Sequence, residues 1–97
     1  MRKGYWIITF RSVKDPAALA GYIELAGPVL TAAGARYVAV GLPAKAYEAG
    51  VLERTIVIEF ESLTKAIEVY ESAEYQQSVQ ALAGAAERDV RVIEAFA

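Results

Sequence analysis

The chain has 97 residues, of which 56% are hydrophobic, and its 10 basic and 12 acidic side chains leave a formal net charge of −2. It contains neither cysteine nor histidine. These absences exclude disulfides, thiol nucleophiles, histidine-based triads and nearly every zinc, copper or haem site. Any chemistry must come from carboxylates, tyrosines, lysines, arginines or a bound cofactor, and we expect neither a metal nor another cofactor.

The length and the even distribution of charge predict one domain over residues 1–97, without linkers. Acidic and basic residues alternate without like-charged runs, so nucleic acid and anionic membranes are not expected as partners. The apolar run that begins at Tyr5 ends at Arg11, which is too short for a signal peptide, and no stretch suffices to span a bilayer. The expected compartment is the cytoplasm.

The first half of the chain predicts a strand, a helix and a second strand. Residues 5–10 are β-branched or aromatic, which is typical of a strand. Asp15 and Pro16 then form a helix start, apolar residues follow at helical spacing, and Gly34 ends the helix. Pro28 lies inside this helix, where we expect a kink. Residues 35–40 predict the next strand.

The second half predicts a strand, two helices and a last strand. Residues 44–52 are left as a loop, and residues 54–61 alternate as a third strand. Ser62 is predicted to cap one helix and Ser72 a second, shorter helix that ends around residues 84–88. The last predicted strand covers residues 90–96.

The resulting order is β-α-β-β-α-β, an α+β class in which a four-stranded antiparallel sheet carries its helices on one face, the ferredoxin-like arrangement. Residues 5–10 are apolar on both faces, although helices can cover only one face of such a sheet. The core of a single small domain can also bury only a limited apolar surface, and this chain carries more than one such core would bury. We therefore expect a homodimer in which a second copy covers the other face.

Glu59 is the candidate catalytic residue, because it lies on the mixed face of the third strand. A half-buried carboxylate needs a partner, without which its pKa would rise. Arg36, Arg54 and Arg91 are the candidate partners. Two interpretations remain open: a polar pocket in which Glu59 is a base or anchor, and an ordinary structural ion pair.

The tyrosines are the second set of candidates for a ligand site. Tyr22 and Tyr70 fall on the apolar faces of two predicted helices, where core packing is the simpler explanation. Tyr37, Tyr47 and Tyr75 are less constrained, and either packing or a pocket would account for them. The ligand-binding candidates are Tyr22, Arg36, Tyr37, Arg54 and Tyr75.

Two nucleotide-related functions are not supported by the sequence. Gly41 and Gly50 belong to no phosphate-binding glycine pattern. The third strand offers Glu59 and Glu61 where an RNA-recognition module presents basic and aromatic residues, and the chain is acidic.

The sequence resembles the DUF1330 family along its whole length. The resemblance rests on residues 3–7, on Asp15-Pro16, on residues 34–37, on the segment Arg-Thr-Ile-Val-Ile-Glu-Phe at 54–60 and on Tyr-Glu-Ser-Ala-Glu-Tyr-Gln at 70–76. It implies a dimeric α+β barrel, in which two ferredoxin-like sheets pack face to face. The wider superfamily holds cofactor-independent monooxygenases and muconolactone isomerase-like, haem-degrading and chlorite dismutase-like enzymes, so the resemblance does not select an activity.

Two functions therefore remain. The first is a cofactor-independent enzyme or a binder of a small hydrophobic or acidic metabolite, with a pocket between sheet and helices. The second is a non-catalytic structural or regulatory homodimer with a filled barrel interior.

Overall fold

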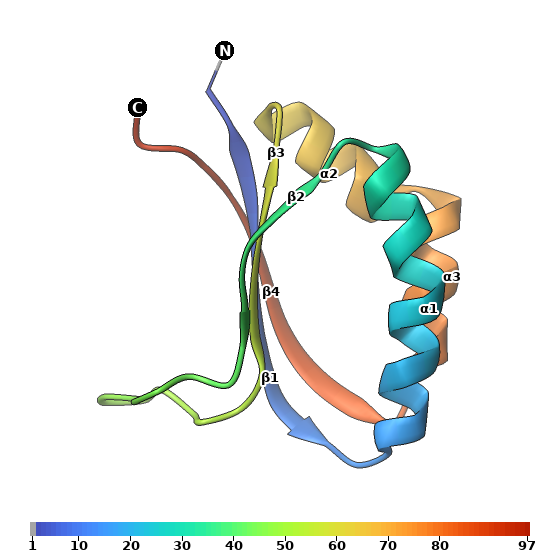
Figure 1. Ribbon diagram of the computed structural model, residues 1–97, viewed down its shortest axis with the longest axis vertical. Helices are drawn as coiled ribbons and strands as arrows, with labels where there is room; N and C mark the ends of the chain where they lie inside the picture. Colours follow the sequence, from blue (N-terminus) through green and yellow to red (C-terminus); the bar gives the residue numbers. More distant parts are fainter. Residues whose placement is uncertain (1) are drawn as a thin grey trace.

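The computed structural model describes residues 2–97 and contains four strands and three helices (Figure 1). In chain order these are β1 (Gly4–Val13), α1 (Pro16–Ala32), β2 (Arg36–Gly41), β3 (Thr55–Phe60), α2 (Leu63–Glu71), α3 (Ala73–Ala81) and β4 (Ala86–Glu94). The expected element order and the α+β class are confirmed.

The strands form one antiparallel sheet in the order β2-β3-β1-β4. The central strands are therefore β1 and β3, in a register that pairs Tyr5 with Glu59 and Ile7 with Val57. One irregularity shifts the register of β1 against β4 just after Phe10, and another lies in β2 after Tyr37. The odd-numbered residues of β1 and those of β3 consequently point to the same face of the sheet.

All three helices lie on one side of the sheet (Figure 1). On that side Trp6, Ile8 and Phe10 of β1 are buried, together with Ile56, Ile58 and Phe60 of β3. The Trp6 indole nitrogen donates a hydrogen bond of 2.8 Å to the carbonyl oxygen of Ala66 in α2. The opposite face carries Ile7 and Val57, and no helix or strand within residues 2–97 covers it (Figure 1), although residues 43–51 lie beside Thr9, Arg11 and Thr55 at one end.

The helix starts follow the expected chemistry. The carboxylate of Asp15 accepts a hydrogen bond from the backbone nitrogen of Ala17, and the hydroxyls of Ser62 and Ser72 accept from backbone nitrogens at the starts of α2 and α3. Helix α1 runs without interruption past Pro28. No helix within residues 2–97 combines the length and the apolar character needed to cross a membrane.

The last strand begins earlier than the sequence indicates. Residues 86–88, expected at the end of a helix, belong to β4, which starts at Ala86 and ends at Glu94 rather than at residue 96. Two features explain the difference. Gly84 adopts a φ of 73° in the turn between α3 and β4, and β1 extends to Val13, where it pairs with Ala86.

Candidate functional site

A cavity of about 250 Å³ lies between α1 and strands β2 and β3. Its lining consists of Tyr22, Ile23 and Ala26 from α1, Tyr37 and Val40 from β2, and Arg54, Ile56 and Ile58 from the β3 segment. A dry cavity of about 150 Å³ suffices to hold benzene. This cavity can therefore hold one substituted ring or an aliphatic molecule of similar size.

Arg54 is the one cationic residue in this lining. Its carbonyl oxygen accepts a hydrogen bond of 2.9 Å from the backbone nitrogen of Phe10, which fixes the residue one step before β3. The Nε atom of Arg54 is buried and finds no hydrogen-bond partner within residues 2–97. The cavity lining contains no carboxylate. A buried donor without a partner is unfavourable, so the side chain of Arg54, which lines the cavity, has an unmet requirement for an acceptor.

Beside the cavity, two phenols and an arginine form a buried cluster. The hydroxyl oxygens of Tyr22 and Tyr75 lie 2.6 Å apart. Arg88 of β4 donates from Nη1 to the Tyr22 oxygen at 3.2 Å and to the Tyr75 oxygen at 3.4 Å, and its guanidinium lies 4.9 Å from the centre of the Tyr22 ring. Burial raises the pKa of Tyr75 far above its usual value, so this phenol stays neutral.

Arg88 of this cluster and Arg54 lie in one row of residues that runs across the sheet. Arg88 pairs with Phe10 in the β1–β4 register, and Phe10 also contacts the backbone of Arg54. Two strand spacings, about 10 Å, thus separate the backbones of the two arginines. Neither arginine forms an ion pair with a carboxylate within residues 2–97. This side of the sheet therefore holds two cations without a protein counter-ion.

Tyr37 completes the cavity at its rim. Its side chain comes from the outermost strand and is 50% exposed. Partial burial raises the pKa of this phenol, so it too is a neutral donor near pH 7. Tyr75, in contrast, is completely buried.

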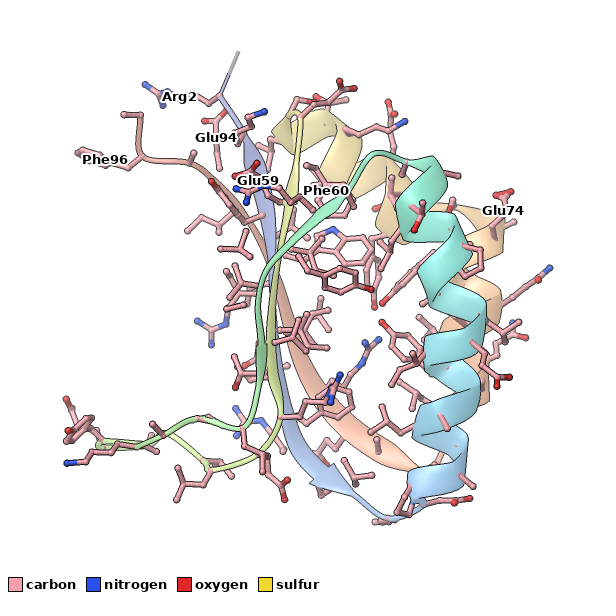
Figure 2. The ribbon with its side chains drawn as sticks, viewed as in Figure 1. Arg2, Glu59, Phe60, Glu74, Glu94 and Phe96 are labelled. Atoms are coloured by element: carbon pink, nitrogen blue, oxygen red, sulfur yellow. The ribbon has the colours of Figure 1, made fainter. Side chains whose placement is uncertain are left out.

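Glu59 lies on the opposite face of the sheet from the cavity. Figure 2 shows Phe60 directed toward the helices and Glu59 away from them. Arg36 holds Glu59 through two contacts, Nε to Oε1 at 3.3 Å and Nη2 to Oε2 at 3.1 Å, and the Tyr5 hydroxyl donates to Oε2 at 2.9 Å. The hydrogen bonds from Arg36, and next that from Tyr5, lower the pKa of Glu59. The carboxylate is thus a stabilised ion.

The six predicted site residues therefore separate into two groups. Tyr22, Tyr37 and Arg54 line the cavity, and Tyr75 contacts Tyr22 beside it. Glu59 and Arg36 form their ion pair on the other face. Arg88 was not among the predicted site residues, because the sequence indicates a helix end at this position, and Tyr5 was not predicted as a partner of Glu59.

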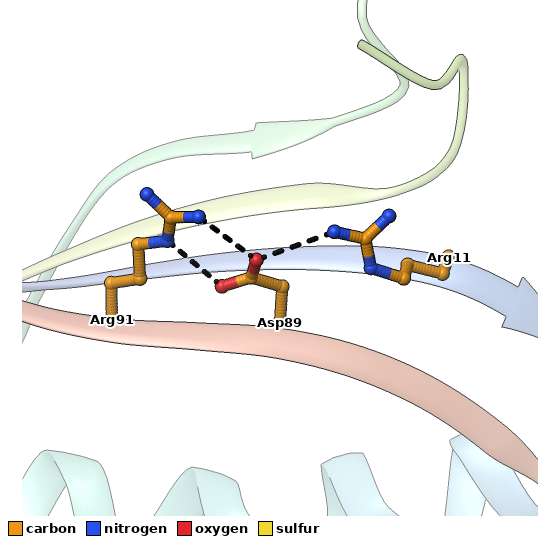
Figure 3. A network of polar contacts seen from close by, with 3 residues as sticks. All are labelled: Arg11, Asp89 and Arg91. Atoms are coloured by element: carbon orange, nitrogen blue, oxygen red, sulfur yellow. Dashed lines mark hydrogen bonds and ion pairs between the residues drawn. The ribbon is translucent and has the colours of Figure 1, made fainter. Parts of the chain in front are cut away.

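A second charged network lies on the same open face (Figure 3). Asp89 of β4 accepts hydrogen bonds from Arg91 at 3.1 and 3.2 Å and from Arg11 at 3.5 Å. Arg91, a candidate partner of Glu59, is thus paired with Asp89. Together with the Tyr5–Glu59–Arg36 group, this network borders the apolar centre formed by Ile7 and Val57.

Other features are weaker candidates. An open groove of about 540 Å³ lies between the end of α1 and the α2–α3 segment, where Lys65, Glu68 and Glu74 supply charges of both signs. Within residues 2–97, no three histidine, cysteine or acidic side chains come close enough together to hold a metal ion.

The sheet order, the antiparallel pairing and the single helical layer define a ferredoxin-like α+β protein. The chain belongs to the DUF1330 family, whose model, described as a domain of unknown function, matches residues 3–96. No curated protein matches the chain in sequence.

Solved structures share this fold at low sequence identity. The RPA0582 protein of unknown function from Rhodopseudomonas palustris has a TM-score of 0.71 and 16% identity, over 99% of this chain and 84% of its own. A dimeric ferredoxin-like protein of unknown function from Thermobifida fusca has a TM-score of 0.67 and 14% identity, over 97% and 92% of the two chains. SnoaB, a cofactor-independent oxygenase from Streptomyces nogalater, has a TM-score of 0.62 and 10% identity, over 100% and 96%.

Proposed function

We propose that the protein is a homodimer in which each protomer binds a small acidic molecule with an apolar body, in the cavity between α1 and strands β2 and β3. The observation that carries this proposal is Arg54, whose buried Nε lacks a partner beside a cavity without a carboxylate. A ligand carboxylate would satisfy this guanidinium, because arginine binds carboxylates with two parallel hydrogen bonds.

The rest of the lining restricts the apolar part of the ligand. Ile23, Val40, Ile56 and Ile58 offer no hydrogen bonds from their side chains, so they favour a hydrocarbon skeleton. The volume of about 250 Å³ restricts that skeleton to one ring or its equivalent. Tyr37 at the rim can donate a further hydrogen bond.

The second copy of the chain is proposed to cover the open face of the sheet. Ile7 and Val57 form its apolar centre, and paired charges border them, as in an interface with an apolar core and a polar rim. Structures with the same fold from Thermobifida fusca and Bacteroides fragilis are described as dimeric.

The alternative, a structural or regulatory dimer without a ligand, agrees with one observation. Arg36 neutralises Glu59, as that alternative requires. A structural or regulatory dimer does not account for the cavity or for the unpaired Nε of Arg54, and we therefore favour the binding function.

Calorimetric titration with benzoate and phenylacetate tests the proposal. We expect saturable binding to the native chain and at least about tenfold weaker binding to Arg54→Gln, since the charged hydrogen bonds to the carboxylate are lost. Arg2→Gln is the matched control, because Arg2 pairs with Glu94 at the far end of the sheet (Figure 2). Equal affinity of Arg54→Gln and native protein, or equal binding of the neutral amides, would disprove the proposal.

A further inference from the structure

We infer that the Tyr22 hydroxyl is the second polar anchor of the cavity and that it donates its hydrogen to a negatively charged phenolate or enolate oxygen of the ligand. This inference rests on the proposed function, since it takes the cavity between α1 and the sheet as a ligand site. It assigns the ligand a second functional group in addition to the carboxylate.

The donors and acceptors that the three side chains of the cluster provide determine the direction of each hydrogen bond. Arg88 can only donate, and it donates to both phenol oxygens. A single hydrogen can lie between the Tyr22 and Tyr75 oxygens, which are 2.6 Å apart. One phenol therefore donates within the cluster, and the other keeps its own hydrogen free for a different acceptor.

Burial decides which phenol keeps the free hydrogen. Tyr75 is completely buried and has no further hydroxyl partner within residues 2–97. If Tyr22 donated to Tyr75, the Tyr75 hydrogen would be buried without an acceptor, which is unfavourable. Tyr75 therefore donates to Tyr22, and the free hydrogen belongs to Tyr22, the phenol that lines the cavity.

This arrangement makes Tyr22 a stronger donor than an isolated phenol. Its oxygen accepts from Tyr75 and from the cation of Arg88, and such chains of hydrogen bonds polarise the terminal O–H. The Arg88 guanidinium also lies over the Tyr22 ring at 4.9 Å. A preorganised, water-shielded donor of this kind stabilises an oxygen on which negative charge resides.

The charged and titratable groups around the site are consistent with an anionic ligand oxygen. Tyr75 faces Tyr22 from α3, Arg88 from β4, and Tyr37 and Arg54 share its cavity from the β2 and β3 side. None of these groups is a carboxylate that would compete for the Tyr22 hydrogen. The ligand class is therefore a monocyclic hydroxyaryl carboxylic acid, or a compact enolisable acid with the same two groups.

The probe 4-hydroxy-3-nitrophenylacetate tests this assignment, because it combines a carboxylate with a phenol whose ionisation is visible in its absorbance. We expect the phenol of the bound probe to ionise at a lower pH than that of the free probe, with the phenolate bound about tenfold more tightly than the phenol. Tyr22→Phe should abolish this shift. Tyr47→Phe, at an exposed position, is the matched control.

The results distinguish a failure of the Tyr22 inference from a failure of the proposed binding function. If Arg54→Gln weakens both ligands but Tyr22→Phe leaves the absorbance shift intact, the inference is overturned and the proposed binding function stands. If neither ligand binds the native chain, both are overturned. Should Tyr22→Phe prove unfolded by circular dichroism, Tyr75→Phe serves instead: it removes one of the two donors to Tyr22 and should reduce the shift, and an unchanged shift would refute the inference.

Discussion

Gly4 and Ser62 come so close that a Cβ atom on Gly4 would lie 2.6 Å from the Ser62 carbonyl oxygen. The Leu63 Cα and backbone nitrogen would lie at 2.7 and 2.8 Å, so the obstacle is backbone at the start of α2 and cannot rotate away. We expect Gly4→Ala to lower the free energy of unfolding by about 1–3 kcal/mol, as overpacking does. Urea denaturation followed by circular dichroism measures this change.

Gly21→Ala is the matched control for that prediction. Gly21 lies inside α1, and a Cβ there meets nothing within 4 Å beyond the adjoining residues and backbone of its own helix. Alanine should raise the stability of the helix by about 0.5–1 kcal/mol at this position. A Gly4→Ala protein as stable as the native chain would show that β1 and α2 pack less closely than described.

The Arg36–Glu59 ion pair gives the protein an acid-sensitive contribution to stability. The contacts with Arg36 and Tyr5 lower the pKa of Glu59 in the folded state. A depressed carboxyl pKa stabilises the fold above the unfolded value of about 4.3 and loses this effect as pH falls through the folded value. We expect Glu59→Gln to be less stable than the native chain at pH 7 and equally stable near about pH 2.

Urea titrations between neutral and acidic pH provide the measurement for this pair. Glu24→Gln on α1 is a suitable control, because Glu24 is exposed and forms no ion pair within residues 2–97. A difference between native protein and Glu59→Gln that does not change with pH would contradict the linkage.

The sequence was sufficient to predict the order of the elements, because local chemistry marks each of them. The alternating strands, the Asp15-Pro16 helix start and the Ser62 and Ser72 caps appear where the patterns indicate. The start of β4 was misplaced, because its pairing depends on how far β1 continues beyond Phe10. That extension is a tertiary property and leaves little local signal.

The candidate site could be predicted only in part. Strand alternation already separates Arg54, in phase with Ile56 and Ile58, from Glu59, so these two residues could not share a pocket. The Tyr22–Tyr75 contact joins residues 53 positions apart and follows from the packing of α1 against α3. Arg88 could be recognised only once β4 was known to include it, since alternation then places it on the helical side with Val90 and Val92.

The proposed dimer leads to a prediction about the open face. Ile7 and Val57 are paired across β1 and β3 at its apolar centre. An aspartate at Ile7 would bring a charge into the apolar centre of a face-to-face dimer, so Ile7→Asp should dissociate the dimer to monomers. Light scattering after size-exclusion chromatography measures the mass, and circular dichroism verifies that the monomer is folded.

Leu25→Asp is the matched control for the open face. Leu25 lies on α1, is 47% exposed and faces away from the sheet's open side, so its variant should stay dimeric. A native chain that is monomeric at every concentration, or an Ile7→Asp variant that stays fully dimeric, would show that the open face is not the interface.

Tyr75 makes the fold sensitive to alkali. Burial, and next the neighbouring Tyr22, raise the pKa of Tyr75 above that of the unfolded chain, about 10. A raised pKa stabilises the fold fully below the unfolded value, and this contribution is lost as pH rises above it, at up to about 1.4 kcal/mol per pH unit.

We expect Tyr75→Phe to show a shallower loss of stability between about pH 10 and pH 11 than the native chain, whereas Tyr47→Phe, at an exposed position, should follow the native curve. Urea denaturation across this range measures the slopes, and identical slopes for native protein and Tyr75→Phe would mean that the Tyr75 phenol ionises as readily in the folded state as in the unfolded chain.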